Sequence, residues 1–278
     1  MTRVALFTAQ DVGYTLVEHF ARKVDLLVMS YDVDRYEAYG YRSALAYCRK
    51  NQVKHVEAPK VDQRVMDALV AHKPDIIVSC WYAKILPVEL LGTARLGGIN
   101  VHPGKLPHYK GRWPTPWYIL NGDPTYGIAV HKMVSEVDAG DVYVQREYPI
   151  PPTMTGHELV RETMRASGEA IIESFAPIVS GKIKAVPQGP GGSRYDHLDK
   201  THTVDWNQPA DIINRHIRVH ARPYEPARAL LDGKWFYLNR ATAVPSTAGQ
   251  PGTLIAPLTV ACGQGALVIE DMQPCADD

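Results

Sequence analysis

Three polar side chains between residues 98 and 141 have types and spacing suited to acyl-transfer chemistry. Asn100 and His102 stand two residues apart in a short apolar run, and an extended chain directs both side chains to the same face. The run breaks at Pro103, so both residues lie where a strand passes into a loop, the usual place for ligand sites in α/β sheets. Asp138 follows in the sequence Val-Asp-Ala-Gly-Asp, again between an apolar stretch and a glycine turn.

Transfer of an acyl group to an amine passes through a tetrahedral oxyanion, and these three residues match its requirements. Asn100 can donate a hydrogen bond to the oxyanion without titrating. His102 can move the proton of the amine near neutral pH. Asp138, if it contacts His102, would orient the ring and raise its pKa. Each residue alone is also common as a structural residue, and the spacing does not by itself bring Asp138 to His102.

The elements that must position these residues follow an alternating order of strands and helices. Apolar runs separated by amphipathic stretches predict a mainly parallel sheet with helices on both faces. The predicted strands are 4–7, 24–29, 55–59, 76–80 and the run to His102, followed by a hairpin-like pair at 127–133 and 141–145. The predicted helices are the stretch after Gly13, 43–51, 65–72, 89–96, the stretch from Trp117 and a long helix ending near Ser180.

Two common nucleotide-binding motifs are missing from this α/β pattern. The first predicted strand is followed by a single glycine, Gly13, and by no GxGxxG, which argues against a dinucleotide site. The sequence also contains no GxxxxGK[ST] phosphate-binding loop. The aromatic and apolar segment Trp81–Leu86 follows the fourth strand, where it either packs over the end of the sheet or lines a ligand site.

The chain divides into three predicted segments. Residues 1–185 form the α/β domain, and residues 186–203, which contain Pro-Gly-Pro-Gly-Gly and no periodicity, are the linker. Residues 204–278 begin with a predicted helix at 210–220 and continue with short alternating apolar runs. These runs predict a small β-rich, barrel-like module.

Composition excludes several classes of function. Lys+Arg and Asp+Glu number 30 each, so the net charge gives no electrostatic reason to bind nucleic acid. The four cysteines are scattered without metal-ligand spacing, which indicates free thiols in a reducing compartment and no metal site. Neither a signal peptide nor a run of eighteen apolar residues is found, and we expect a cytoplasmic protein with no membrane partner.

Four motifs follow one another along the chain: Asn100-Val-His102, Leu106-Pro107 to Arg112, Asn121-Gly122 and Val137 to Asp141. They resemble the signature of the 10-formyltetrahydrofolate-dependent formyltransferases, and the resemblance covers nearly the whole chain. Their order and spacing are far more specific than any one of them alone, and the family's catalytic Asn, His and Asp fall on Asn100, His102 and Asp138. The best match is to sugar N-formyltransferases of the type that formylates UDP-4-amino-4-deoxy-L-arabinose. The matching motifs are Asn100-Val-His102, Leu106-Pro107 to Arg112, Pro114, Trp117, Asn121-Gly122, His131 to Val134, Val137 to Asp141, Asp205-Trp206, Gln250 to Gly252 and Ala261 to Leu267.

The resemblance implies a formyltransferase fold with a C-terminal oligonucleotide-binding-like module, and 10-formyltetrahydrofolate as the formyl donor. It implies donor contacts in the loop after the fourth strand and near the Asp138 turn, at Trp81, Tyr82, Ile85, Leu86, Val137 and Asp141. It places the acceptor near Lys105, Tyr109, Arg112 and Trp117. Arg112 could hold a phosphate or carboxylate of the acceptor, or it could brace its own loop.

Gly104-Lys105 departs from the Ser-Leu that is usual in the family, which alters a polar contact of the loop and adds a charge. We expect a nucleotide-linked amino sugar as the acceptor. The alternatives are N-hydroxyornithine, methionyl-tRNA, hydrolysis with water in place of the amine, and a non-catalytic binding protein that has kept the fold. A tRNA acceptor would require a basic channel, and residues 204–278 contain few Lys and Arg. The oligomeric state stays open, with a homodimer compatible with the resemblance.

Overall fold

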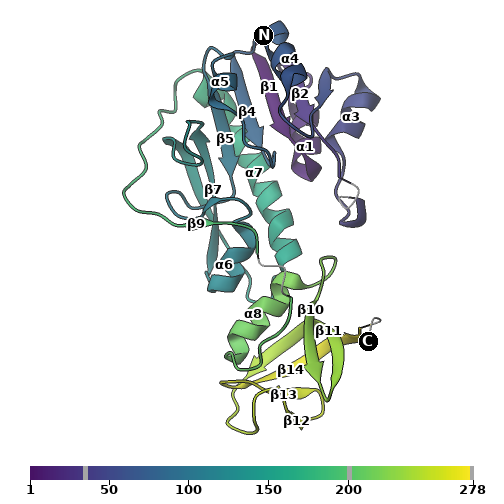
Figure 1. Cartoon of the computed structure of the whole chain (residues 1–278). Helices are drawn as coiled ribbons and strands as arrows, with labels where there is room; N and C mark the ends of the chain where they lie inside the picture. Colours follow the sequence, from purple (N-terminus) through teal and green to yellow (C-terminus); the bar gives the residue numbers. More distant parts are fainter. Residues whose placement is uncertain (34–36, 199–201, 276–278) are drawn as a thin grey trace. The chain divides into compact units, whose positions relative to one another are not determined.

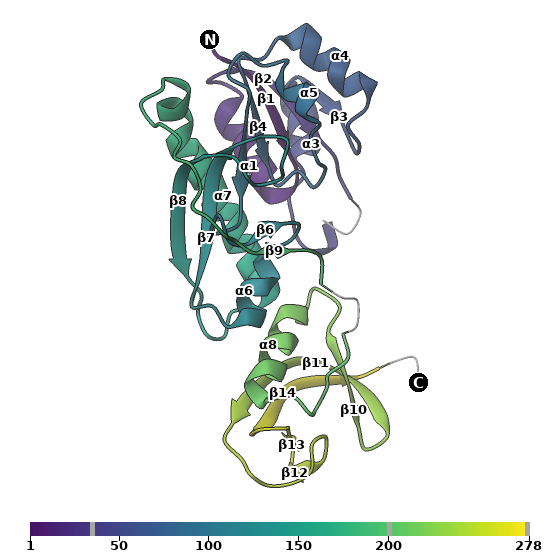
Figure 2. The ribbon, with the colours of Figure 1, turned by 60° about the vertical axis from the view of Figure 1, so that its left-hand side comes forward.

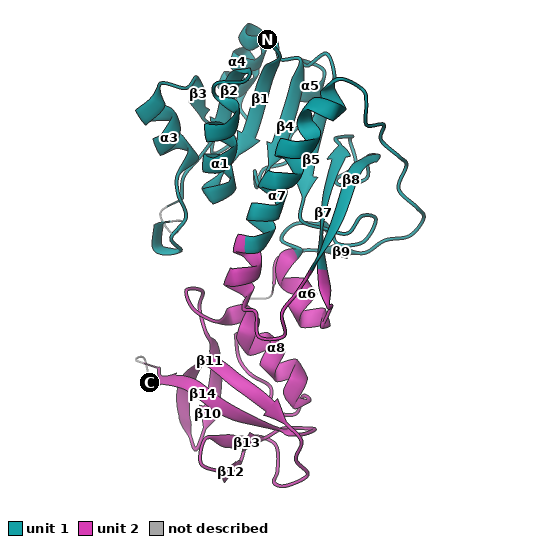
Figure 3. Cartoon of the chain, turned by 180° about the vertical axis from the view of Figure 1, so that it is seen from behind, with its two compact units in different colours: residues 1–114, 126–148, 162–196 teal, residues 115–125, 149–161, 197–278 magenta. Residues whose placement is uncertain are grey.

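The computed structural model describes residues 1–33, 37–198 and 202–275, and these residues form two compact units. The first unit contains residues 1–114, 126–148 and 162–196, and the second contains residues 115–125, 149–161 and 197–278 (Figure 3). The positions 34–36 in the predicted α/β domain, 199–201 in the predicted linker and 276–278 in the predicted module lie outside the described residues.

The first unit is built on a seven-stranded sheet in the order β3-β2-β1-β4-β5-β7-β8 (Figure 1). The strands β3 to β5 in this order are parallel, whereas β7 runs antiparallel to β5. The predicted mainly parallel sheet is therefore confirmed, and the antiparallel strand is an addition. The strand bounds are β1 Arg3–Thr8, β2 Asp25–Ser30, β3 His55–Glu57, β4 Ile76–Cys80, β5 Gly98–His102, β7 Thr125–Lys132 and β8 Val142–Pro149.

Helices cover both faces of this sheet, as its apolar strands require. On one face α4 and α5 join the odd-numbered residues of β1 in a core that includes Phe7, Leu69 and Leu90. On the other face α1 and α7 contact each other through the rings of Phe20 and Phe175, 5.0 Å apart (Figure 2). The helix bounds are α1 Gln10–Phe20, α3 Ala44–Asn51, α4 Gln63–His72, α5 Val88–Leu91, α6 Thr115–Asn121 and α7 Gly156–Val179.

Two helix starts show why these segments are helical where the sequence predicts it. The Ser43 side chain accepts a hydrogen bond from the Ala46 amide and caps α3. The Asp62 carboxylate accepts hydrogen bonds from the amides of Arg64 and Val65 and caps α4. Such caps satisfy amides that have no partner inside the helix.

The second unit contains a five-stranded antiparallel sheet in the order β10-β11-β14-β13-β12. Helix α8, Ala210–His220, packs Ile213 and Ile217 against this sheet in a common core with Leu238 and Leu267. The predicted β-rich module is thus confirmed, although within the described residues the two edge strands are not paired with each other. The strand bounds are β10 Ala227–Leu231, β11 Lys234–Val244, β12 Leu254–Ala256, β13 Thr259–Ala261 and β14 Ala266–Pro274.

The stretch predicted as a linker has structure of its own. Its residues up to Asp196 belong to the first unit. Strand β9, Arg194–Tyr195, pairs in parallel with β6, Lys110–Gly111, directly after the loop that follows His102. Among the described residues, every helix is too short or too polar to cross a bilayer.

Ile77 on β4 provides a test of the sheet core. Its side chain is fully buried in the cluster beneath α4 and α5. Replacement by alanine leaves a cavity, and we expect Ile77→Ala to lower the free energy of unfolding by about 2–5 kcal/mol. Urea denaturation followed by circular dichroism measures this loss. Val70→Ala is the control, because Val70 is 57% exposed, and an equal loss in both variants would contradict the assigned core.

Candidate active site

The register of three neighbouring strands positions the first two site residues. On β5, Asn100 lies between Ser79 of β4 and His131 of β7, and His102 lies opposite Ala129 of β7. Both residues are at the carboxyl end of β5, after which Pro103 and Gly104 begin a loop. Asn100 and His102 therefore lie at the end of a strand, as the sequence predicts. Strand β7 adds a second histidine, His131, directly across from Asn100.

His102 lies between two acceptors and is 4% exposed. Its Nε2 is 2.6 Å from the carbonyl oxygen of Tyr109, and its Nδ1 is 3.6 Å from Oδ1 of Asp138. A carbonyl at 2.6 Å requires that Nε2 carries the hydrogen, which leaves Nδ1 without a proton in the neutral ring. A second proton therefore enters at Nδ1, beside the carboxylate of Asp138.

Asp138 is 7% exposed and lies in a tight turn with φ 58°. Its Oδ2 accepts a hydrogen bond from the amide of Gly111 at 2.8 Å, and its Oδ1 lies 3.5 Å from Nε2 of His131. Burial raises the pKa of this carboxyl, but the attraction of His102 and His131 and the Gly111 hydrogen bond outweigh it and leave the pKa at about 2. Asp138 is ionised at neutral pH.

Burial and the Asp138 charge act on His102 in opposite directions. Burial lowers the pKa of His102, since the charged imidazolium loses its hydration, and the nearby His131 adds to this. The Asp138 carboxylate and the Tyr109 carbonyl raise it, and the net direction is downward from 6.5. A neutral His102 at physiological pH is able to act as a base, and Asp138 stabilises the imidazolium that forms.

His131 is the site residue to which sequence reasoning assigned no role. Its Nδ1 donates to the carbonyl of Lys132 at 2.8 Å, so Nε2 of the neutral ring accepts from Nδ2 of Asn100 at 3.2 Å. This bond orients the amide of Asn100, and its second N–H remains available as a donor. The sequence pointed to His131 only through its presence in a matching motif. The antiparallel pairing of β7 with β5 is a long-range contact, and the residues around His131 do not predict it.

Gly104 lies where the chain has no room for a side chain. A Cβ at this position would be 2.4 Å from Nε2 of His102 and 2.6 Å from the carbonyl oxygen of Tyr109. The glycine, which replaces the family's serine, therefore allows His102 to take the position that it has in this chain. Lys105, the next residue, pairs with Glu147 on β8 at 3.2 Å.

The predicted donor-binding residues follow β4 and surround the Asp138 turn. Trp81 is half-buried, has φ 56° and donates its indole N–H to Ser167 on α7 at 3.1 Å. Tyr82 and Leu86 belong to the sheet core, where the Tyr82 hydroxyl donates to the carbonyl of Ala58 at 2.6 Å. The remaining members of this set are Ile85, which is 71% exposed, Val137, which is half-buried, and Asp141, which pairs with Lys132 at 2.9 Å.

The predicted acceptor-binding residues are divided between the two units. Tyr109 is buried, stacks on Tyr195 with ring centroids 4.8 Å apart, and contributes its carbonyl to His102. Arg112 is exposed and lies directly after β6. Trp117 is half-buried on α6, which belongs to the second unit.

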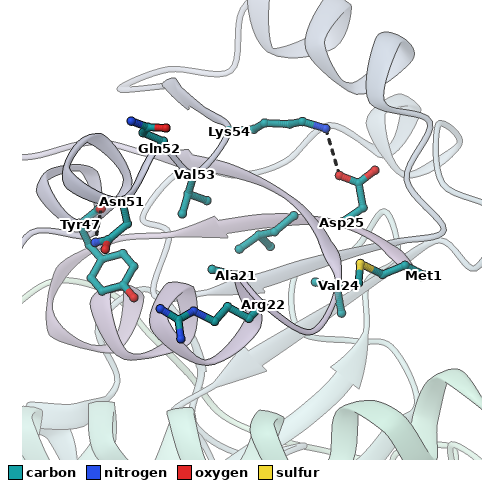
Figure 4. A pocket seen from close by; sticks show the side chains of 11 residues that line it. Met1, Ala21, Arg22, Val24, Asp25, Tyr47, Asn51, Gln52, Val53 and Lys54 are labelled. Atoms are coloured by element: carbon teal, nitrogen blue, oxygen red, sulfur yellow. Dashed lines mark hydrogen bonds and ion pairs between the residues drawn. The ribbon is translucent and has the colours of Figure 1, made fainter.

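A cavity of about 430 Å³ lies at the end of the first sheet that is opposite to His102 and Asp138 (Figure 4). It is lined by Val24 and Asp25 before and at the start of β2 and by the segment 51–54, whose Lys54 pairs with Asp25 at 3.1 Å. The cavity lies at the amino-terminal ends of the parallel strands, and His102 lies at their carboxyl-terminal ends. The cavity contains none of the predicted site residues.

Comparison with known proteins supplies the family. Residues 33–175 match the formyl transferase family model, and residues 199–277 match that of the formyl transferase C-terminal domain. The chain belongs to the formyl transferase family. A methionyl-tRNA formyltransferase of Myxococcus xanthus is 32% identical over 75% of this chain and 68% of its own length. The predicted activity, formyl transfer by an enzyme, is thereby confirmed.

Solved structures of formyltransferases share the fold over its full length. The sugar 3N-formyl transferase WlaRD, solved with dTDP and 5-N-formyl-THF, has a TM-score of 0.75 and 14% identity over 97% of each chain. The N-formyltransferase of Helicobacter canadensis, in complex with folinic acid and dTDP-3-aminofucose, has a TM-score of 0.76 and 15% identity, covering 98% of this chain and 100% of its own. At these identities the similarity establishes the fold of this formyltransferase.

The pairing of Asp138 with His102 predicts a pH effect. The Asp138 charge raises the pKa of His102, so its removal in Asp138→Asn lowers that pKa further. The acid limb of the rate profile, along which His102 becomes protonated, should move to lower pH. The maximal rate should fall about 10²-fold or more, because the imidazolium loses its stabilising charge. Formyl transfer measured between pH 5 and 9 tests this, and an unchanged profile would exclude the coupling.

Proposed function

We propose that this formyltransferase moves a formyl group from 10-formyltetrahydrofolate to the primary amine of a nucleotide-linked amino sugar. The observation that carries the proposal is the arrangement of Asn100, His102 and Asp138, in which the imidazole and the carboxylate are buried and lie 3.6 Å apart. The donor is proposed to bind at the loop after β4 and near the Asp138 turn, and the acceptor near Tyr109 and Arg112.

Each residue of the arrangement has a role in direct attack by the amine. The free N–H of Asn100 donates to the formyl oxygen as negative charge develops on it. The amine nitrogen forms its bond to the formyl carbon, and His102 takes up the proton that this nitrogen loses. The bond from the formyl carbon to N10 breaks, His102 returns the proton to N10, and tetrahydrofolate leaves. Asp138 stays ionised and stabilises the imidazolium of His102 during the transfer.

Charge in the C-terminal part of the chain favours a small acceptor over tRNA. Residues 204–278 contain six Lys and Arg against eight Asp and Glu. Arg215 pairs with Asp211 at 2.8 Å and Arg240 with Glu270 at 2.8 Å, so two of the six are neutralised within the unit. A nucleic-acid ligand requires cations that neutralise its phosphates, and this segment is a poor source of them.

Methionyl-tRNA is the second candidate acceptor. It is favoured by the relative with 32% identity, which is a methionyl-tRNA formyltransferase. Both candidates present a primary amine to the formyl carbon, so the same three residues serve either reaction. The choice between them therefore depends on acceptor binding and not on the catalytic residues.

A panel of acceptors tests the proposal. Purified enzyme with 10-formyltetrahydrofolate is offered UDP-, GDP- and dTDP-linked amino sugars, methionyl-tRNA and N-hydroxyornithine, and formylated products are measured by mass spectrometry. We expect an amino sugar to give the highest kcat/KM, and His102→Ala to reduce it by about 10²–10⁴-fold while circular dichroism stays unchanged. Higher kcat/KM for methionyl-tRNA would replace the proposed acceptor, and formate release without any acceptor would indicate a hydrolase.

Arg112 provides a separate test of acceptor binding. Its exposed guanidinium, next to β6, is suited to a phosphate or carboxylate group of the acceptor. We expect Arg112→Ala to raise the acceptor KM about tenfold or more and to leave kcat within about threefold, because one charged contact is lost from binding. Arg64→Ala is the control, since Arg64 pairs with Asp62 at the start of α4. An unchanged acceptor KM would remove Arg112 from the acceptor site.

A further inference from the structure

The segment 186–195 runs along both loops that hold the active site. At its start Val186 and Val142 exchange two backbone hydrogen bonds, of 2.8 and 2.9 Å. At its end β9 pairs with β6 (Figure 2). The sequence of this segment contains Pro-Gly-Pro-Gly-Gly and predicts a linker, yet its backbone is tied to the first unit at both ends.

Gln188 contacts the turn that carries Asp138. Its Nε2 donates to the carbonyl oxygens of Asp138 at 2.7 Å and of Gly140 at 2.8 Å. A primary amide has two N–H groups, so one side chain joins both ends of the three-residue turn. Asp138 is in the left-handed region, with φ 58°, which is costly for a residue other than glycine and is kept only where the surroundings hold it.

Ser193 contacts the loop that supplies the other partner of His102. Its Oγ accepts from the amide of Tyr109 at 3.1 Å, and its carbonyl oxygen accepts from the amide of Lys110 at 2.9 Å. Tyr109 also has a left-handed backbone, with φ 59°. Gly192 allows this approach, because a Cβ there would be 2.3 Å from the carbonyl oxygen of Pro107.

We infer that the segment 186–195 positions the active site, with Gln188 as a positioning residue for Asp138 and Ser193 as one for Tyr109. Both partners of His102 are backed by this segment, Asp138 through its turn and the Tyr109 carbonyl through its loop. The inference rests on the proposed role of His102 as the base. It assigns to Gln188 and Ser193 a role in catalysis that acts through Asp138 and Tyr109.

Gln188→Met tests the inference, since methionine has nearly the length of glutamine, is uncharged and donates no hydrogen bond. We expect kcat to fall about tenfold or more, because Asp138 is displaced, with the acceptor KM within about twofold, because the acceptor is proposed to bind near Tyr109 and Arg112 and not at the Asp138 turn. The pKa of His102, followed by NMR of the imidazole without substrates, should fall as the Asp138 charge moves away. The acid limb of the rate profile should move in the same direction.

The control is Gln145→Met on the exposed side of β8, which should leave kcat and the pKa of His102 at wild-type values. A folded Gln188→Met with unchanged kcat and unchanged His102 pKa would overturn the inference. So would a lower kcat with an unchanged His102 pKa, which would mark a merely structural role. The NMR titration needs no acceptor, so its result is independent of whether the proposed acceptor is correct.

Ser193→Ala is the second variant, for the case that Gln188→Met does not fold. It removes the side-chain acceptor for the Tyr109 amide and keeps the backbone pairing of β6 with β9. We expect a loss of kcat in the same direction but smaller, with altered shifts at Nε2 of His102, the nitrogen that donates to Tyr109. Wild-type kcat and wild-type His102 shifts in a folded Ser193→Ala would overturn its part of the inference.

Discussion

The burial of one ionised carboxylate organises the active site of this formyltransferase. Asp138 is 7% exposed and still ionised, and a buried charge is tolerated only when its surroundings supply hydrogen bonds or groups that can take up the opposite charge. The Gly111 amide donates to one carboxylate oxygen, and the rings of His102 and His131 face the other. These groups come from the three strands β5, β6 and β7, so the requirement to satisfy one carboxylate fixes the place of these strands around the Asp138 turn. A loop that moved away would leave the charge without a partner.

The same constraint adjusts the chemistry of His102. Its burial alone would make protonation costly, and a base that cannot hold a proton is of little use for transfer from an amine. The Asp138 carboxylate at 3.6 Å offsets part of that cost at Nδ1, while the Tyr109 carbonyl holds the hydrogen of Nε2. Asn100 is fixed separately by Nε2 of His131, so the proposed donor for the oxyanion and the proposed base are oriented by different partners. The two functions therefore do not compete for one hydrogen bond.

Much of this fold is predictable from the sequence, because β1, β2 and β4 are short apolar runs and the helices between them have clear apolar stripes. Asn100 and His102 are also predictable, since alternation along β5 places both side chains on one face. Asp138 was assigned to the site through the family resemblance, because the 35 residues between it and His102 give no distance. His131 and Gln188 could not be placed at all. The position of His131 depends on the long-range antiparallel register of β7 with β5. Gln188 lies in a Pro- and Gly-rich segment, which contacts the site through its backbone and two polar side chains.

The way the site is held also bears on why relatives with one reaction serve different acceptors. The groups that fix Asp138 and His102 are largely backbone amides and carbonyls, at Gly111, Tyr109 and the Asp138 turn. Their geometry depends on glycines such as Gly104, on the course of the chain and on the side chains of Gln188 and Ser193 in the segment 186–195. Exposed side chains such as Arg112 can then change without disturbing the base or its carboxylate. With Arg112 as the proposed acceptor-binding residue and His102 as the proposed base, acceptor choice would depend on exposed side chains and formyl transfer on groups held by the backbone.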